Sequence, residues 1–195
     1  MMVHPLDYSL ILFDLDGTVR QCRQHSTPGK PAPCHNAPGE WEIIPGTREV
    51  LAQYDWSRIG FGVVTNQAGI ALGYIEEKTV VAEIYQTLHD CFFETQHVPY
   101  HRFPTKGNAS RIRYSPAAPD ASSPWRKPSP LMILDLVVAY EERLDRTLYV
   151  GDSTEDAMAA ARAGIAFLPA WEFFGRPMAL LNTVKAHEMK EQENA

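Results

Sequence analysis

Short apolar runs alternate with segments of helical character along the chain. Four of these runs have the length and composition of buried strands, and they lie at 9–13, 59–64, 147–150 and 165–168. Capping residues, apolar periodicity and alanine content predict helices at 46–54, 76–92, 130–144 and 155–163, and again from about 177 onward. Strands that alternate with helices require crossover connections. The pattern therefore predicts an α/β fold, a Rossmann-like three-layer sandwich with a central parallel sheet.

Two irregular stretches interrupt this pattern. Residues 20–40 and 104–124 are rich in proline and glycine and lack apolar periodicity, so we expect loops there. A length of 195 residues is ample for one domain and marginal for two. We therefore expect residues 1–195 to form a single domain.

Polar residues directly follow three of the predicted strands. Asp14 follows the first, Thr65 follows the second, and Asp152 follows the third after one glycine. The carboxyl ends of parallel strands meet at one edge of a sheet, where such folds place their reactive groups. The sequence therefore predicts that three separate segments deliver polar side chains to one site.

The residues around Asp14 have a specific chemical meaning. In the stretch DLDGT, Asp14 and Asp16 flank one apolar residue, and the turn at Gly17 can bring both carboxyl groups toward one cavity. One carboxylate can attack phosphorus as a nucleophile. A second can protonate the leaving oxygen and then deprotonate a water molecule. The alternative interpretation is a pair of aspartates that cap a strand-to-loop turn.

Four motifs in this order resemble those of the haloacid dehalogenase (HAD) superfamily. They are ILFDLDGT at the first predicted strand, VVTNQ at the second, WRKP at 125–128 and VGDSTED at 150–156. Each motif is short, but the set spans nearly the whole chain. The presence of Asp16 implies phosphatase rather than dehalogenase chemistry, because the dehalogenases of this superfamily lack an acid at that position.

The resemblance implies roles for four carboxylates. Asp14 would be the nucleophile and a ligand of Mg²⁺, and Asp16 would be the general acid and base, with its backbone carbonyl also on the metal. Asp152 would complete the metal site, and Asp156 would orient the groups behind it. Magnesium prefers hard oxygen ligands and keeps several waters, which agrees with so small a ligand set.

The resemblance also implies residues that bind the phosphoryl group. Thr65 and the backbone amide of Asn66 would hold its oxygens, Lys127 would neutralise its charge, and Arg126 would contact the rest of the substrate. Lys106, Arg111 and Arg113 form with Arg126 a set that could grip a second anionic group; the alternative is a solvated basic loop.

Two gaps separate the motifs, from Asp14 to Thr65 and from Thr65 to Lys127, and neither is long enough for a full cap domain. We therefore expect the loops at 20–40 and 104–124 to roof the site.

Three further stretches resemble one branch of this superfamily, the branch that contains heptose bisphosphate and histidinol-phosphate phosphatases. They are GEWEIIPG, TNQAGIALG and RKPSP. That branch usually carries a zinc loop with three cysteines before the Arg-Lys-Pro motif, whereas residues 97–126 contain no cysteine. We therefore expect Mg²⁺ and no zinc. A second group of possible zinc ligands lies in the loop at 20–40 and consists of Cys22, His25, Cys34 and His35. The spacing of these residues is not a standard zinc pattern.

Composition narrows the classes of function. The chain has 18 basic and 24 acidic residues and a net charge of −6, which disfavours a nucleic-acid partner. Three cysteines make a poor disulfide framework, and no apolar run is long enough to span a membrane, so we expect a cytoplasmic protein. The leading hypothesis is a phosphatase of small phosphorylated metabolites such as sugar phosphates. The alternatives are a polynucleotide 3′-phosphatase and a catalytically silent binding module; the sequence predicts no oligomeric state.

Overall fold

A computed structural model describes residues 4–23, 39–93, 110–120 and 122–176. Within these ranges, five parallel strands form one sheet in the order β5-β4-β1-β6-β7. The bounds of these strands are β1 Leu10–Phe13, β4 Gly60–Asn66, β5 Ile112–Ser115, β6 Thr147–Gly151 and β7 Ala166–Pro169. A separate antiparallel hairpin is formed by β2 Arg20–Cys22 and β3 Trp41–Ile43.

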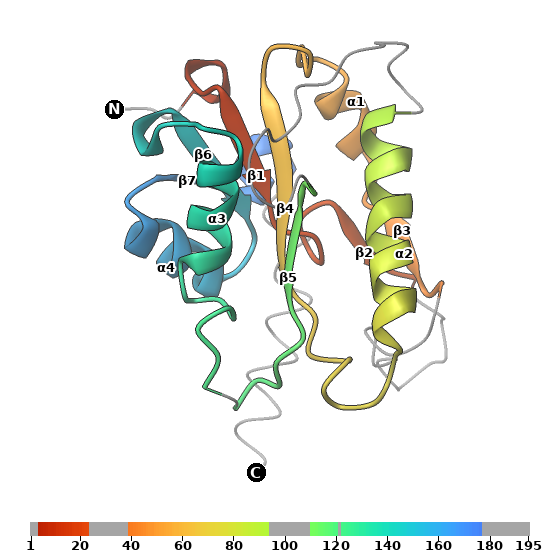
Figure 1. Cartoon of the computed structure of the whole chain (residues 1–195). Helices are drawn as coiled ribbons and strands as arrows, with labels where there is room; N and C mark the ends of the chain where they lie inside the picture. Colours follow the sequence, from red (N-terminus) through yellow and green to blue (C-terminus); the bar gives the residue numbers. More distant parts are fainter. Residues whose placement is uncertain (1–3, 24–38, 94–109, 121, 177–195) are drawn as a thin grey trace, which may run out of the picture.

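Helices cover both faces of the sheet (Figure 1). On one side lie α1 Thr47–Leu51, α2 Glu77–Leu88 with a π-helical turn at His89–Phe93, and α5 Ala170–Phe173. On the other side lie α3 Leu131–Ala139 and α4 Thr154–Ala163. Two short 3-10 turns, Pro5–Asp7 and Leu144–Arg146, precede β1 and β6. The predicted three-layer α/β sandwich is therefore confirmed.

The alternation of side chains along β1 explains why both faces need a helical cover. Leu10 and Leu12 pack toward α3 and α4, whereas Ile11 and Phe13 pack toward α1, α2 and α5. All four side chains are fully buried. A central strand that is apolar on both faces is stable only between two layers, because successive side chains point to opposite sides of the sheet.

A glycine lets α3 approach the sheet closely. A Cβ atom on Gly60 of β4 would lie 2.9 Å from a ring carbon of Tyr140, which directly follows α3. The Tyr140 hydroxyl donates a hydrogen bond of 2.5 Å to the backbone carbonyl of Phe61. The missing side chain at position 60 thus makes room for a ring that is tied to the next residue of the same strand.

The predicted irregular stretches contain strands that the sequence analysis missed. The region at 104–124 includes β5, the edge strand of the main sheet, and the region at 20–40 includes β2. β5 carries little apolar periodicity because Arg111 and Arg113 stand beside and within it. Their partners come from elsewhere in the fold: the guanidinium of Arg111 lies 4.1 Å from the Phe61 ring centroid, and Arg113 pairs with Asp135. Tertiary contacts therefore override the local pattern.

The predicted helices exist, with shifted ends. α3 stops at Ala139 rather than near residue 144, and Glu141 just beyond it takes a left-handed conformation with φ of 53°. α4 matches its prediction closely and ends at Gly164 in a left-handed conformation. Helix α5 was not predicted, and the helix predicted from about residue 177 lies outside the described residues.

The carboxyl ends of the strands lie at one end of the sheet, from which the segments after β4 and β5, yellow and green in Figure 1, leave it. Among the described residues, the link from β1 to α1 holds a small hairpin and no cap domain. The parts of the expected roof at 24–38 and 104–109 lie outside the described residues. In the part of the chain that is described, no helix is long and apolar enough to cross a membrane.

Candidate active site

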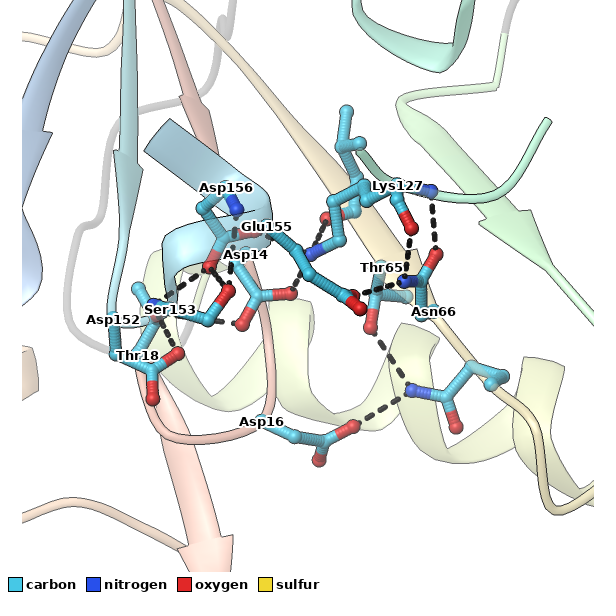
Figure 2. A network of polar contacts seen from close by, with 12 residues as sticks. Asp14, Asp16, Thr18, Thr65, Asn66, Lys127, Asp152, Ser153, Glu155 and Asp156 are labelled. Carbon is cyan, nitrogen blue, oxygen red and sulfur yellow. Dashed lines mark hydrogen bonds and ion pairs between the residues drawn. The ribbon is translucent and has the colours of Figure 1, made fainter. Parts of the chain in front are cut away.

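Three carboxylates converge at the carboxyl end of the central strands. Asp14 directly follows β1, Asp152 directly follows β6, and Asp156 lies in the first turn of α4. One carboxylate oxygen from each lies within 4.8 Å of the others. Figure 2 shows the three side chains turned toward one another. Clustered carboxylate oxygens are the ligand type that hard divalent cations take, so this arrangement can hold a metal ion.

A tight turn after β1 makes room for this cluster. Gly17 has φ of 90°, a conformation that residues with a side chain rarely adopt. A Cβ atom at this position would lie 2.4 Å from a carboxylate oxygen of Asp152. The Thr18 hydroxyl, next in the chain, lies 3.4 Å from a carboxylate oxygen of Asp14 and 3.4 Å from one of Asp152. The turn therefore brings the two carboxylates together.

We expect the substitution Gly17→Ala to weaken cation binding and to lower stability. The new methyl group would collide with Asp152, and the left-handed backbone adds about 1–2 kcal/mol of strain. Gly73→Ala is the matched control, because Gly73 has φ of 72° with nothing within 4 Å of the added carbon. Calorimetric titration with Mg²⁺ should show a lower affinity in Gly17→Ala alone. Equal affinities in the two variants would contradict the steric argument.

Asp156 is oriented by four hydrogen bonds. One oxygen accepts from Lys127 Nζ at 2.6 Å and from the Tyr149 hydroxyl at 2.9 Å. The other accepts from the backbone amide of Ser153 at 3.0 Å and from its hydroxyl at 2.6 Å, as part of a capping box at the start of α4. Four donors match the acceptor capacity of a carboxylate, so Asp156 is suited to orient its neighbours rather than to bind an ion directly.

Lys127 is the cation at the centre of the cluster. Its ammonium group lies 2.5 Å from a carboxylate oxygen of Asp14 and 2.6 Å from one of Asp156, and it donates to the carbonyl of Val64 at 3.3 Å. The residue is 4% exposed. Figure 2 shows it reaching in from the segment after β5, above Thr65. The side chain predicted to neutralise phosphate charge therefore lies beside the predicted nucleophile.

The charges of this site are unbalanced. Burial, opposed by Lys127 and reinforced by the neighbouring carboxylates, raises the pKa of Asp14 well above its usual value. Burial and the charge of Asp156 raise the pKa of Asp152 to about 6. Burial works against the ammonium of Lys127, but Asp14 and Asp156 outweigh it and raise the pKa of Lys127. Three carboxylates, of which Asp14 and Asp156 are buried and Asp152 is half-buried, stand against one lysine and leave an excess of negative charge that a cation would offset.

Thr65 and Asn66 lie at the end of β4, where the resemblance placed the phosphate-binding groups. The Thr65 hydroxyl oxygen accepts a hydrogen bond from the Gln67 side chain at 3.0 Å. No acceptor for its own proton is found among the described residues, so this proton can be donated to a ligand. The Asn66 side chain is used otherwise. It accepts from the backbone amide of Lys127 at 3.0 Å and donates to the carbonyl of Lys127 at 3.2 Å and to Glu155 at 3.0 Å. Asn66 thus fixes the backbone of Lys127.

Asp16 lies on the Thr65 side of Asp14 (Figure 2) and accepts hydrogen bonds on both oxygens. Arg20 donates to one oxygen at 2.7 Å and Gln67 to the other at 2.7 Å. Its side chain is 26% exposed, in contrast to the buried Asp14. The position is therefore open enough for a carboxyl group to exchange a proton with a ligand or with water.

The basic residues considered for a second anion do not act as one group. Arg111 and Arg113 are buried against Phe61 and Asp135, as described above, so neither is a solvated loop residue. Arg126 is half-buried beside Lys127, and its guanidinium donates to the carbonyl of Ala117 at 3.0 Å. Lys106 lies outside the described residues. Of the three arginines in this candidate set, only Arg126 is next in sequence to Lys127.

Several residues that support the site have no role implied by the motifs. Tyr149, buried in β6, donates its hydroxyl proton to Asp156 at 2.9 Å and accepts a hydrogen bond from Lys127 Nζ at 3.1 Å. Arg20 and Gln67 contact Asp16, and the Arg176 guanidinium donates to the carbonyl of Thr18 at 2.8 Å. These residues match no separate motif. The one available signal was that Gln67 ends the VVTNQ stretch.

Comparisons with known proteins agree with this geometry. Residues 120–170 match the family described as haloacid dehalogenase-like hydrolase. The chain is 31% identical over 160 residues to D-glycero-beta-D-manno-heptose-1,7-bisphosphate 7-phosphatase of Bordetella bronchiseptica, covering 80% of this chain and 77% of the relative. It is 33% identical to the enzyme of the same name from Pseudomonas putida, covering 64% of this chain and 65% of the relative.

A solved structure gives the same result. The crystal structure of D,D-heptose 1.7-bisphosphate phosphatase from B. bronchiseptica, complexed with magnesium and phosphate, superposes with a TM-score of 0.63 at 30% identity, covering 82% of this chain and 78% of the other. The fold and the site define a hydrolase with an acidic centre at the end of a parallel sheet. The chain belongs to the phosphatases of the haloacid dehalogenase superfamily, as the four motifs predicted.

Proposed function

We propose that this protein is a magnesium-dependent phosphatase that removes one phosphoryl group from a sugar bisphosphate through an aspartyl-phosphate on Asp14. The observation that carries the proposal is the placement of a buried Asp14 beside Lys127 and Asp152, at the edge where β1, β4 and β6 end. The names of its relatives indicate the substrate class, since they act on a heptose 1,7-bisphosphate.

The proposed first step is attack on phosphorus. A carboxylate oxygen of Asp14 forms a bond to phosphorus while the bond to the leaving alcohol breaks, and Asp16 donates a proton to the leaving oxygen. Lys127 and the Thr65 hydroxyl, with the Asn66 backbone amide, stabilise the charge of the phosphoryl oxygens. In the second step, Asp16 takes a proton from a water molecule that attacks phosphorus and releases Asp14.

The residues present fit a hydrated magnesium ion. Asp14 and Asp152 supply carboxylate oxygens, and Asp16 would contribute its backbone carbonyl; Asp156 is occupied by its four donors. So few protein ligands leave several positions to water and phosphate, as Mg²⁺ prefers. When bound, the ion supplies positive charge that lets an anionic phosphate approach the anionic Asp14.

Arg126 is proposed to contact the substrate beyond the reacting phosphate. It precedes Lys127 directly, it is half-buried, and one of its nitrogens is held by Ala117. A planar guanidinium suits a second phosphate group. A bisphosphate substrate supplies such a group.

The proposal is tested by measuring phosphate release from three substrates. A heptose 1,7-bisphosphate, a hexose bisphosphate and a 3′-phosphorylated oligonucleotide are each assayed after chelation and again after Mg²⁺ is added. We expect activity only with Mg²⁺, and a kcat/KM for the heptose bisphosphate at least about 100-fold above that for the oligonucleotide. A preference for the oligonucleotide would support a polynucleotide 3′-phosphatase. No magnesium-dependent release from any substrate would support a silent binding module.

Elemental analysis of protein purified without added metal completes the test. We expect no stoichiometric zinc, because structural zinc usually takes four ligands, often thiolates, and residues 97–126 contain no cysteine. Of Cys22, His25, Cys34 and His35, the last three lie outside the described residues. One zinc per chain that is lost in Cys22→Ser or Cys34→Ser would contradict this expectation.

A further inference from the structure

We infer that Arg20 and Gln67 are positioning residues that hold the carboxyl group of Asp16 for proton transfer. The inference rests on the proposed role of Asp16 as general acid and base. Neither residue is assigned a role by the motifs. Both donate hydrogen bonds to the carboxyl group of Asp16.

The two residues bind opposite oxygens of the same carboxyl group. Arg20 Nε donates to one oxygen of Asp16 at 2.7 Å, and Gln67 Nε2 donates to the other at 2.7 Å. The carboxyl group cannot rotate about its terminal bond without breaking one of these contacts. Two donors on opposite oxygens therefore fix its plane, which an exposed aspartate would not keep.

Arg20 is itself held by the fold. It is 4% exposed, and its guanidinium donates to the Thr87 hydroxyl of α2 at 3.4 Å and lies 4.0 Å from Glu83. The carbon at the centre of the guanidinium lies 5.3 Å from the centroid of the Trp41 ring in the hairpin. Arg20, the first residue of β2, thus contacts both α2 and the facing strand β3, and these contacts fix the guanidinium that binds Asp16.

Gln67 is anchored from the other side of the site. Its backbone amide donates to the carbonyl of Ser115, at the end of β5, at 2.8 Å. Its side-chain nitrogen also donates to the Thr65 hydroxyl at 3.0 Å. Gln67 thus ties the proton-transfer group to the hydroxyl proposed to bind the phosphoryl oxygens. The relative position of the two groups is set by one side chain.

Positioning of this kind affects the rate of proton transfer rather than substrate binding. A general acid must lie within hydrogen-bond distance of the leaving oxygen. A leaving group such as p-nitrophenolate departs without a proton, whereas an alcohol requires one. Loss of either clamp should therefore slow the hydrolysis of an alkyl phosphate more than that of p-nitrophenyl phosphate.

The test compares these two substrates in full-length Arg20→Gln, Gln67→Leu and Asp16→Asn. Arg23→Gln is the matched control, because Arg23 follows the same strand and its side chain is exposed. We expect the ratio of kcat/KM for glycerol phosphate to kcat/KM for p-nitrophenyl phosphate to fall on the order of tenfold in Arg20→Gln and in Gln67→Leu. This ratio reports the step in which the leaving group departs, and not the later hydrolysis of the phosphoenzyme that both substrates share. The ratio should fall further in Asp16→Asn and stay unchanged in Arg23→Gln.

An equal loss of kcat/KM for both substrates in the clamp variants, while Asp16→Asn discriminates between them, would overturn the positioning inference and leave the proposed function intact. No discrimination in Asp16→Asn itself would instead refute the role of Asp16 in the proposed function. Because Arg20 is buried, Arg20→Gln could fail to fold. In that case Gln67→Leu decides, since Gln67 is half-buried and its backbone bond to Ser115 persists.

Discussion

The substitution Asp14→Asn is expected to abolish turnover, with a loss of kcat on the order of 10⁴-fold or more. A carboxamide is a poor nucleophile, and the change also removes one carboxylate from the proposed metal site. Rates of phosphate release measure the effect. Mass spectrometry of acid-quenched enzyme should detect a phosphoryl adduct in the wild-type protein and none in the variant.

The fold should survive this change. Burial and the neighbouring carboxylates raise the pKa of Asp14, despite the lowering effect of Lys127. A raised pKa means that ionisation of this side chain is less favourable in the folded state than in the unfolded state, so its neutral isostere should leave the free energy of unfolding in EDTA unchanged or higher. Near-wild-type turnover in Asp14→Asn would rule out the covalent mechanism. A loss of activity together with unfolding would leave Asp14 a structural residue only.

Of the substitutions proposed here, Lys127→Met is expected to cause the largest loss of stability, and it should also cause a loss of activity. The substitution leaves Asp14 and Asp156 buried without their counter-charge, which typically costs about 3–5 kcal/mol. It also removes a charge that would stabilise the phosphoryl oxygens, so kcat/KM should fall on the order of 100-fold or more. Urea unfolding in EDTA and phosphate-release rates measure the two effects.

The loss of stability should depend on pH. Burial opposes ionisation of Asp156, but Lys127 and Ser153 outweigh it and lower the pKa of Asp156. The ion pair of Asp156 with Lys127 therefore stabilises the fold fully above the usual carboxyl pKa of 3.8, and this contribution is lost as the pH falls below it. The raised pKa of Lys127 keeps its contribution complete throughout the neutral range. The difference between wild type and Lys127→Met should therefore be largest near neutral pH and should shrink in acid.

Two further variants test whether the loss of stability in Lys127→Met comes from its buried ion pairs. Lys78→Met is the matched control, because the Lys78 side chain is 83% exposed and pairs only with exposed Glu76 at 2.7 Å among the described ion pairs; we expect a change within about 0.5 kcal/mol. Adding Asp156→Asn to Lys127→Met should recover part of the lost stability, because it removes one unpaired charge. Additive losses in the double variant would contradict the proposed coupling.

Local features of the sequence were enough to predict the frame of the fold. Apolar runs ending in Asp14, Thr65 and Asp152 predicted three strands whose ends meet at one edge, and the structure confirms them as β1, β4 and β6 and shows that they are neighbours. The start of α4 and its end at Gly164 were equally clear. These predictions hold because strand burial, capping and left-handed glycine conformations depend on residues that are close in sequence.

Other features depend on contacts between residues far apart in the chain. β5 pairs with β4 although Arg113 lies within it and Arg111 directly before it. The fold accommodates these side chains against Asp135 and Phe61, and no pattern within 104–124 contains that information. The side chain of Asn66 also matched a motif, yet it binds the backbone of Lys127, 61 positions away. A motif identifies a residue's place in the fold but not the direction in which its side chain points.

The sequence by itself determined the class of protein, the parallel sheet and the edge at which the acidic residues meet. Only the tertiary structure decided how those residues are paired: Lys127 between Asp14 and Asp156, and Asp16 between Arg20 and Gln67. The physical reason is that strand and turn formation follow from local steric preferences and apolar pattern. Ion pairs and hydrogen bonds are set by distances and directions that arise only when distant segments pack together.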